Sequence, residues 1–293
     1  MTEEEPESEG WPAAETADVA SENESNPSWE RVQLARHPKR PHSWDYIQGL
    51  TTGFEELHGD RLFGDDKSII AGMGFFEGRA VVMIGQQKGR NTKEKLLRNF
   101  GMPKPEGYRK ALRIMRLGAK FRRPIITFVD TPGAYPGIDA EERGQAEAIA
   151  YCLREMARLQ TAVITVVIGE GGSGGALGLG LANRVYMLEN AYYSVISPES
   201  CAAIIYRDSG KAPEAAAALR MTADDLMTMK LIDGIVPEPP GGAHLDPETA
   251  IIAVRQTLKQ AVEELSAYSA EQLIDERYTK FREMGNFFEE DAV

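Results

Sequence analysis

The chain has 293 residues, of which 42% are hydrophobic and 27% charged, and its formal net charge is −12. This composition suits one large globular domain or two small ones, and no apolar run is long enough to span a membrane. The chain has two cysteines without a Cys-x-x-Cys pair, no cluster of its four histidines, and an acidic N-terminus without a signal pattern. We therefore expect a cytoplasmic protein with reduced thiols and no metal site of its own.

The negative charge belongs to the N-terminal segment. Residues 1–30 hold ten of the 45 acidic residues and no lysine or arginine, which leaves 35 acids against 33 bases in the rest of the chain. A segment rich in Glu, Ser, Pro and Asn without an apolar period is typical of disorder, with an acidic docking arm as the alternative. We therefore expect a disordered acidic tail over residues 1–40, a folded domain over 41–285 and a short tail over 286–293.

The domain is expected to begin with a helix and a hairpin. Ser43 can cap a helix through Trp44–Leu57, because apolar residues recur there at helical spacing. After a polar turn, the apolar runs Ile69–Phe76 and Arg79–Gly85 predict two strands joined by a two-residue turn.

A strongly basic segment follows the hairpin. Between Gln86 and Arg123 there are thirteen lysines or arginines and only two acids. The helix predicted after Gly107 carries a basic stripe at helical spacing, formed by Arg109, Arg113, Arg116 and Lys120. Such a stripe is either a solvated face or a site for phosphates or an acidic partner. Specific nucleic-acid binding is not predicted, because few aromatic residues and no known binding module accompany the bases.

Two units of strand, glycine turn and helix then follow in tandem. In the first, Ile125–Val129 is an apolar strand, residues 130–137 form a Gly/Pro turn, and Asp139 has the capping-box pattern of a helix start. In the second, a β-branched run over residues 163–168 predicts a buried strand, and residues 169–172 turn the chain into a helix. Tandem units of this kind predict neighbouring parallel strands with right-handed crossovers.

The helix of the second unit is rich in glycine. Residues 173–182 contain four glycines, and each costs roughly 1 kcal/mol relative to alanine in a helix. Close packing on the sheet or close approach to a ligand can offset that cost. The unpaired N–H groups and the positive dipole end at such a helix N-terminus suit an oxyanion.

The rest of the chain alternates short strands and capped helices. Strands are predicted over residues 184–188 and 192–195 and within LIDGIVPE, and Ala212–Leu219 is an alanine-rich helix. Four further helices are predicted to start at the caps Ser197, Thr222, Asp246 and Ser269.

The central glycine loop allows three interpretations. Gly169–Gly174 fits the dinucleotide-binding pattern G-x-G-x-x-G. Gly171–Gly175 fits the G-x-S-x-G turn of a serine hydrolase, with the triad Ser173, Asp233 and His244. In the third interpretation the loop provides only backbone N–H donors, Ser173 starts the helix, and the reactive groups arrive on carriers.

Seven segments resemble a known family. They are GQQKGRNTKE, RNFGMPKPEGYRKALR, ITFVDTPGAYPG, AEERGQAEAIA, VIGEGGSGGALGLG, YSVISPESC and IDGIVPEPPGGAH. Over roughly residues 41–285 they make the chain similar to the carboxyltransferase alpha subunit of the heteromeric bacterial and plastid acetyl-CoA carboxylase. Gln86, Ser200 and Tyr206 stand where the family pattern has histidine, glycine and tryptophan.

The resemblance implies a fold, a reaction and an assembly. The implied fold is α/β and crotonase-like, a spiral of ββα units with surrounding helices. The implied reaction moves a carboxyl group from carboxybiotin, presented by a carrier protein, to acetyl-CoA, which gives malonyl-CoA. No cofactor would be bound covalently, and ATP would be used by a separate biotin carboxylase subunit. The implied partners are a zinc-ribbon beta subunit in an alpha2beta2 heterotetramer, biotin carboxyl carrier protein and biotin carboxylase, without a membrane.

The resemblance also implies site residues. Gly174 and Gly175 would form a backbone oxyanion hole for biotin. The other implied substrate contacts are Gly171, Gly172, Gly133, Ala134, Tyr135, Lys88 and Arg90. The alternatives are a serine hydrolase that uses Ser173 and a non-catalytic scaffold that binds acidic partners.

Overall fold

A computed structural model describes residues 26–285 of the chain, so the predictions for residues 1–25 and 286–293 fall outside the described residues. Its centre is a mixed, eight-stranded sheet in the order β1-β2-β3-β4-β5-β6-β8, with β7 paired to β5 off this path. The strands are β1 Thr52–Glu56, β2 Ile69–Phe76, β3 Arg79–Gln86, β4 Ile125–Thr131, β5 Val163–Gly172, β6 Arg184–Leu188, β7 Tyr192–Ser194 and β8 Gly234–Val236.

The strand directions follow the predicted units. β1, β2 and β3 are antiparallel, and β2 and β3 form the expected hairpin. Its two turn residues, Glu77 and Gly78, both have positive φ angles (48° and 74°), which is typical of a type I′ turn. β3, β4, β5, β6 and β8 are parallel, as the tandem units predict.

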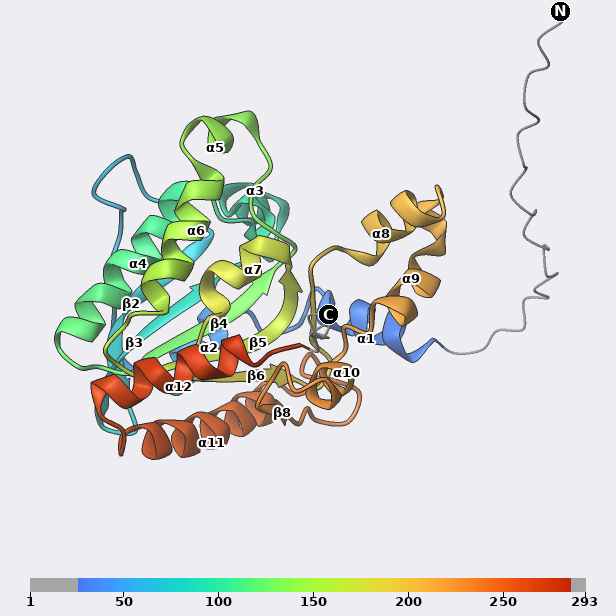
Figure 1. Cartoon of the computed structure of the whole chain (residues 1–293). Helices are drawn as coiled ribbons and strands as arrows, with labels where there is room; N and C mark the ends of the chain where they lie inside the picture. Colours follow the sequence, from blue (N-terminus) through green and yellow to red (C-terminus); the bar gives the residue numbers. More distant parts are fainter. Residues whose placement is uncertain (1–25, 286–293) are drawn as a thin grey trace, which may run out of the picture.

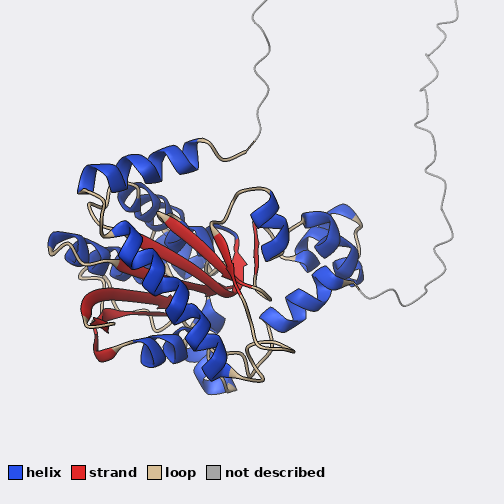
Figure 2. Ribbon diagram, turned by 90° about the horizontal axis from the view of Figure 1, so that it is seen from below, coloured by secondary structure: helices blue, strands red, loops and turns tan. Residues whose placement is uncertain are grey.

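Helices cover both faces of the sheet (Figures 1 and 2). The helices are α1 Pro27–Ala35, α2 Ser43–Leu50, α3 Thr92–Leu97, α4 Pro105–Lys120, α5 Ile138–Glu142, α6 Gln145–Met156, α7 Ser173–Gly180, α8 Pro198–Ile205, α9 Ala212–Leu219, α10 Ala223–Thr228, α11 Pro247–Leu265 and α12 Ala270–Arg282. Figure 1 shows α4, α6 and α7 on one side of the sheet, with α12 against the end of α6, and the other side is covered by α2 and α11. Every residue of β4 and β5 is buried, which is expected for parallel strands covered on both faces.

The structure corrects the expected start of the folded domain. We expected it near Pro41, but α1 already begins at Pro27, capped by the side chain of Asn26. Val32 of α1 is fully buried, and Arg40 is 2% exposed and forms an ion pair with Glu238. The segment before Pro41 is therefore part of the folded domain from residue 26 onward.

The first predicted helix is also wrong in its second half. α2 ends at Leu50, and residues 52–56 form β1, paired antiparallel with β2. Thr51 is already extended and Gly53 has a φ of 59°, so β-branched and glycine residues end the helix there. The N-cap is His42 rather than Ser43, whose hydroxyl instead donates to the carbonyl of Gln86.

Two turn predictions need correction, and the other caps are confirmed. Asp139 does not cap a helix, because the N-cap of α5 is Gly137 and a separate helix, α6, begins at Gln145. Residues 169–172 are not a turn but the last residues of β5. The helix starts predicted at Ser197, Thr222, Asp246 and Ser269 are all observed, each with the cap side chain accepting a backbone N–H.

Candidate functional site

Two glycine-rich segments, the glycine turns, meet at the carboxyl ends of β4 and β5: residues 132–137 after β4, and the junction of β5 with α7 at residues 172–175. Thr131, the last residue of β4, pairs with Gly171 of β5. A side-chain carbon built on Gly172 would lie 2.1 Å from the Pro132 carbonyl oxygen. The same carbon on Gly175 would lie 2.4 Å from the backbone nitrogen of Ala134. The segment 132–134 therefore packs directly against the start of α7, and glycine is required at both contacts.

The start of α7 presents backbone donors. Its N-cap is Gly172, and no side chain among the described residues caps it. The first N–H groups of a helix have no intrahelical partner, so those of Ser173, Gly174 and Gly175 are available. A side-chain carbon on Gly174 would have Ile149 as its nearest neighbour, at 3.9 Å. The space beside Gly174 is therefore open, whereas that beside Gly175 is filled by the segment 132–134.

The loop from Pro132 to Gly137 forms a wall rather than a second set of donors. The Gly133 N–H donates to the Thr131 hydroxyl at 3.1 Å, and the Tyr135 N–H donates to the Pro103 carbonyl at 3.0 Å. Gln145 holds the loop further, because its amide donates to the carbonyls of Pro103 and Tyr135. The N–H groups of Gly133 and Tyr135 are therefore occupied within the protein.

A buried glutamine supports the donor turn. Gln86 donates from its amide nitrogen to the Gly175 carbonyl at 2.7 Å, and its amide oxygen accepts the Asp130 N–H at 3.1 Å. The Tyr108 hydroxyl donates to the same Gly175 carbonyl at 3.2 Å. These bonds fix the orientation of the first turn of α7 relative to β3 and β4. Sequence analysis noted Gln86 only as a departure from the family pattern and missed this supporting position.

The two predicted basic contacts have different environments. The Lys88 ammonium lies 2.7 Å from Asp130 and 2.5 Å from Glu170, inside the protein. Burial opposes its charge, but these two carboxylates raise the pKa of Lys88 overall. The guanidinium of Arg90 is half exposed and lies 2.5 Å from Asp45. Lys88 is thus neutralised by internal carboxylates, whereas Arg90 remains at the surface.

Glu170 is the centre of a buried charge network that sequence analysis missed. It accepts from Arg36 at 2.6 Å and from the Tyr192 hydroxyl at 2.6 Å, in addition to Lys88. Burial opposes ionisation, but Lys88 and Arg36 lower the pKa of Glu170 to about 2. Arg36 also pairs with Glu199, so the network connects α1, β5 and α8. The one sequence feature that could have indicated this network is the single acidic residue in the glycine-rich end of β5.

A small cavity lies beside this network. It has a volume of about 320 Å³ and extends from Pro132 to the surface. Its lining includes several basic and apolar side chains, among them Arg36, His42, Lys88, Arg90, Lys95 and Phe100. Burial lowers the pKa of His42, so this imidazole is neutral at pH 7.

The hydrolase triad is not assembled. Asp233 accepts from the N–H of Val185, which begins the pairing of β6 near Thr165 of β5. That position is seven residues before Gly172, or roughly 23 Å along an extended strand. The ring of His244 stacks on His37, with their centroids 3.8 Å apart. The prediction of a serine hydrolase using Ser173 with Asp233 and His244 is therefore wrong.

The basic stripe is largely used within the fold. Arg109 pairs with Asp60 at 2.8 Å, and Arg116 pairs with Glu155 at 2.7 Å. Arg113 donates to the carbonyls of the loop that precedes β2. Of the four stripe residues, only Lys120 forms neither an ion pair nor a side-chain hydrogen bond with any of residues 26–285. These contacts give three of the four bases a structural role.

Residues 26–285 contain neither a cluster of metal ligands nor a membrane-spanning helix. No group of three or more His, Cys, Asp or Glu side chains in this range is arranged to hold a metal ion. No helix in the same range is long and apolar enough to cross a membrane. Two of the departures from the family pattern lie on or after α8: the Ser200 hydroxyl accepts from the Ser197 hydroxyl at 2.9 Å, and the Lys211 ammonium lies over the ring of Tyr206.

The sequence matches one family along most of its length. The model of the acetyl co-enzyme A carboxylase carboxyltransferase-like family matches residues 16–285. The chain is 58% identical over 261 residues to the acetyl-coenzyme A carboxylase carboxyl transferase subunit alpha of Thermus thermophilus, covering 89% of this chain and 84% of the relative. It is 59% identical over 261 residues to the protein of the same name from Geobacter sulfurreducens, covering 89% and 82%.

Solved structures with low sequence identity share the fold. A transcarboxylase 12S structure has a TM-score of 0.64 at 19% identity and covers 87% of this chain and 48% of that chain. A Pseudomonas malonate decarboxylase hetero-tetramer has a TM-score of 0.64 at 18% identity and covers 80% of this chain and 91% of that chain. These similarities confirm the α/β, crotonase-like fold predicted from the sequence.

Proposed function

The chain belongs to the acetyl co-enzyme A carboxylase carboxyltransferase family, and we propose that it is the alpha subunit, which transfers a carboxyl group from carboxybiotin to acetyl-CoA. The product is malonyl-CoA. The observation that supports this reaction is the uncapped N-terminus of α7, held against the segment 132–134 at the end of β4. Carboxybiotin supplies the carboxyl group, so the protein has to bind, orient and stabilise charge.

The N–H groups of Gly174 and Gly175 act as the oxyanion hole in this proposal. Preorganised backbone donors stabilise charge as it develops in a transition state, and removal of one donor typically costs a factor of 10² to 10³ in kcat. The dipole of α7 adds positive potential at the same point. The surroundings of Gly174 are open, since the nearest atom to a side-chain carbon placed on it belongs to Ile149, at 3.9 Å.

The remaining predicted contacts line this centre. Gly171 and Gly172 belong to the strand end, where the ring of Tyr193 and the Pro132 carbonyl leave no room for a side chain. Gly133, Ala134 and Tyr135 are proposed to form the wall of the site that lies opposite the start of α7. Arg90 at the rim is proposed as a contact for a substrate carboxylate or phosphate, since its guanidinium is half exposed and paired with one surface carboxylate, Asp45, whereas Lys88 is held between two buried ones.

The alpha subunit is proposed to work with a beta subunit that completes the site. Large apolar side chains are exposed around the mouth of the site: Leu96 (62%), Leu97 (57%), Phe100 (48%) and Ile138 (78%). Leu96 and Leu97 belong to α3, Phe100 follows it, and Ile138 begins α5; Figure 1 shows α3 and α5 at the top of the molecule, above α7. Burying these apolar side chains in an interface would favour association by about 25 cal/mol for each Å² of apolar surface removed from water. We propose a zinc-ribbon beta subunit in an alpha2beta2 assembly, with a biotin carrier protein and an ATP-using biotin carboxylase as further partners.

The function is tested by reconstitution with the beta subunit. The purified chain alone should not decarboxylate malonyl-CoA in the presence of biotin, and the mixture with the beta subunit should. Turnover by the isolated chain at the rate of the mixture would contradict the proposal of a shared site.

A variant of Ser173 distinguishes catalysis by backbone N–H donors from catalysis by a side-chain nucleophile. Ser173 is exposed and has a φ of 52°, as the serine of a nucleophile elbow would have. Ser173→Ala keeps the backbone N–H and the strained conformation but removes the hydroxyl. The reconstituted variant should retain carboxyl transfer within a few-fold of the wild type. Complete loss of turnover in a folded, assembled variant would indicate nucleophilic catalysis instead.

A further inference from the structure

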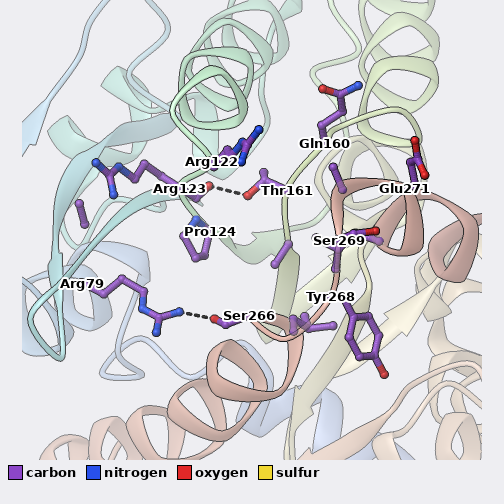
Figure 3. Close-up of a pocket in the computed structure, with 15 residues that line it drawn as sticks. Arg79, Arg122, Arg123, Pro124, Gln160, Thr161, Ser266, Tyr268, Ser269 and Glu271 are labelled. Carbon is purple, nitrogen blue, oxygen red and sulfur yellow. Dashed lines mark hydrogen bonds between the residues drawn. The ribbon is translucent and has the colours of Figure 1, made fainter.

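A second cavity lies at the opposite end of the sheet from the glycine turns. Its volume is about 730 Å³. It opens where β3 begins at Arg79 and where Pro124 leads into β4, whereas the glycine turns follow the other ends of β4 and β5. The connection between α11 and α12 closes its other side (Figure 3). This cavity is therefore separate from the proposed site of carboxyl transfer.

Three arginines dominate the lining of this cavity: Arg79, Arg122 and Arg123. The Arg79 guanidinium donates to the Ser266 hydroxyl, and neither it nor the other two pairs with a carboxylate among residues 26–285. Nearby acids are used elsewhere, because Glu77 pairs with Arg255 and Glu155 pairs with Arg116. None of the three charges is therefore neutralised by a carboxylate of the described residues, and Figure 3 shows their guanidiniums spread along one side of the cavity, with that of Arg79 turned towards Ser266.

The only acidic residue in the lining is Glu271. Figure 3 shows its carboxylate on the far side of the cavity from Arg79. It belongs to the first turn of α12, a 13-residue helix whose N-cap is Ser269. The N-terminal dipole of α12 adds positive potential at that side of the cavity. The hydroxyl of Ser266 and the amide of Gln160 are the neutral polar groups available beside the arginines.

The backbone of Arg122 suggests that its side chain is needed. α4 ends in a Schellman motif, in which the Arg122 N–H bonds to the Ala119 carbonyl and the Arg123 N–H bonds to the Gly118 carbonyl. Arg122 has a φ of 52° in this motif, at the position where glycine is preferred. A left-handed backbone is costly for any residue with a side chain. Glycine would satisfy the turn, so the guanidinium is the feature that an arginine adds here.

We propose that this cavity binds a small molecule that carries a phosphate or diphosphate group. Arginine forks match phosphate oxygens in bidentate geometry, and three unneutralised guanidiniums match the charge of a diphosphate. The cavity volume is within the usual range of small-molecule sites, so an organic group can be held beside the phosphates. The side chain of Tyr268 at the rim offers an aromatic face for such a group.

The proposal is tested by calorimetric titration of the full-length chain at fixed, low ionic strength. The ligands are inorganic pyrophosphate, adenosine diphosphate and coenzyme A, each measured separately. Arg122→Gly is the main variant, because it removes one guanidinium and relieves the positive φ, so the fold should be retained or stabilised. Arg123→Gln removes a second guanidinium. Lys230→Gln, at an exposed lysine outside the lining, is the control with the same change in net charge.

Pyrophosphate should bind the wild-type chain, and Arg122→Gly and Arg123→Gln should each weaken it by about tenfold or more, as expected for a lost bond to a charged group. Lys230→Gln should leave the affinity unchanged. Tighter binding of adenosine diphosphate than of coenzyme A would identify a separate nucleotide ligand, and the reverse order would identify the acyl carrier's own diphosphate. Absence of pyrophosphate binding, or equal affinities in all four proteins, would overturn the proposal. Because binding is measured without turnover, this result does not depend on carboxyl transfer.

Discussion

The contact between the two glycine turns makes a sharp prediction for Gly175. A methyl group at this position would lie 2.4 Å from the Ala134 nitrogen and 2.4 Å from the Gly133 carbonyl carbon. Both are backbone atoms, so no side-chain rotation can relieve the overlap. Ordinary contact begins at 3.4 Å, so the segment 132–134 and the start of α7 must separate by about 1 Å in Gly175→Ala.

This separation has an energetic and a catalytic cost. Overpacking in a well-packed region costs about 1–3 kcal/mol, and the gain in helix propensity from glycine to alanine returns at most about 1 kcal/mol. We therefore expect a net destabilisation of about 1–2 kcal/mol. A displacement of about 1 Å at a reacting centre can cost a factor of 10² in rate. In Gly175→Ala the donor N–H moves by that amount, so kcat should fall about 100-fold while the chain still folds.

Gly174→Ala is the matched control, because the same methyl group added one residue earlier has no neighbour within 3.9 Å. This variant should be as stable as the wild type or more stable by up to about 1 kcal/mol. Both variants would be mixed with the beta subunit and assayed for carboxyl transfer. Thermal unfolding followed by circular dichroism would measure stability, and gel filtration would confirm assembly.

The outcome depends on the difference between the two variants. A Gly175→Ala protein with wild-type kcat and wild-type melting temperature would show that the two turns do not form one rigid unit. A Gly174→Ala protein with a lower melting temperature than Gly175→Ala would contradict the packing of α7 against the segment 132–134. Loss of activity in Gly174→Ala alone, with unchanged stability, would place the substrate directly over that residue.

Three further predictions concern charged groups. Lys88 and Arg36 lower the pKa of Glu170 to about 2 from its ordinary value of 4.5, so its contribution to stability is present above pH 4.5 and is lost as pH falls towards 2. In Glu170→Gln the slope of the unfolding free energy over this window should be smaller by up to ~1.4 kcal/mol per pH unit in denaturant titrations. Arg277 is fully buried and donates to the carbonyls of Met156, Leu159 and Thr161. Because Arg277→Met would leave these buried carbonyls without donors, it should lower the free energy of unfolding by about 3 kcal/mol or more. An unchanged denaturation midpoint would contradict this. Deletion of residues 1–40 should cost about 3–5 kcal/mol because buried Glu238 loses Arg40, whereas deletion of residues 1–25 preserves that pair; equal melting temperatures of the two truncated chains would refute the difference.

The elements with local signals could be predicted from the sequence. The hairpin of β2 and β3, the parallel strands β4 and β5, and four helix caps are each encoded within a few neighbouring residues. Side-chain caps and β-branched runs act over a single turn or strand, so tertiary contacts are not needed to recognise them.

The errors occurred where tertiary contacts decide the structure. α1 buries only Val32 and Ala35, which is too weak an apolar period to mark a helix within an acidic segment. Its position depends on Arg36 and Arg40, whose partners Glu170 and Glu238 lie more than 130 residues away in sequence. β1 appeared helical because its apolar residues continue the spacing of α2, although it pairs as an edge strand with β2.

Sequence analysis grouped all bases of residues 86–123 together, but their partners divide them into three kinds. Arg109 and Arg116 are paired with acids of neighbouring elements and stabilise the fold. Lys88 is paired beneath the glycine turns, where it keeps Glu170 ionised. Arg122 and Arg123 face a cavity without a carboxylate partner. Charge density along the sequence therefore cannot separate structural bases from binding ones, because that distinction depends on where the acids fold.

The charge network also links the N-terminal helix to the proposed donor turn. Glu170 lies two residues before Gly172 on β5, and its carboxylate accepts from Arg36 after α1, Lys88 after β3 and Tyr192 on β7. A buried carboxylate that loses one of these donors has to move towards another or take up a proton. Either change acts on the backbone of β5, which continues directly into the N–H groups of α7. The position of the proposed oxyanion donors therefore depends on the docking of α1, a segment that composition alone assigned to a tail.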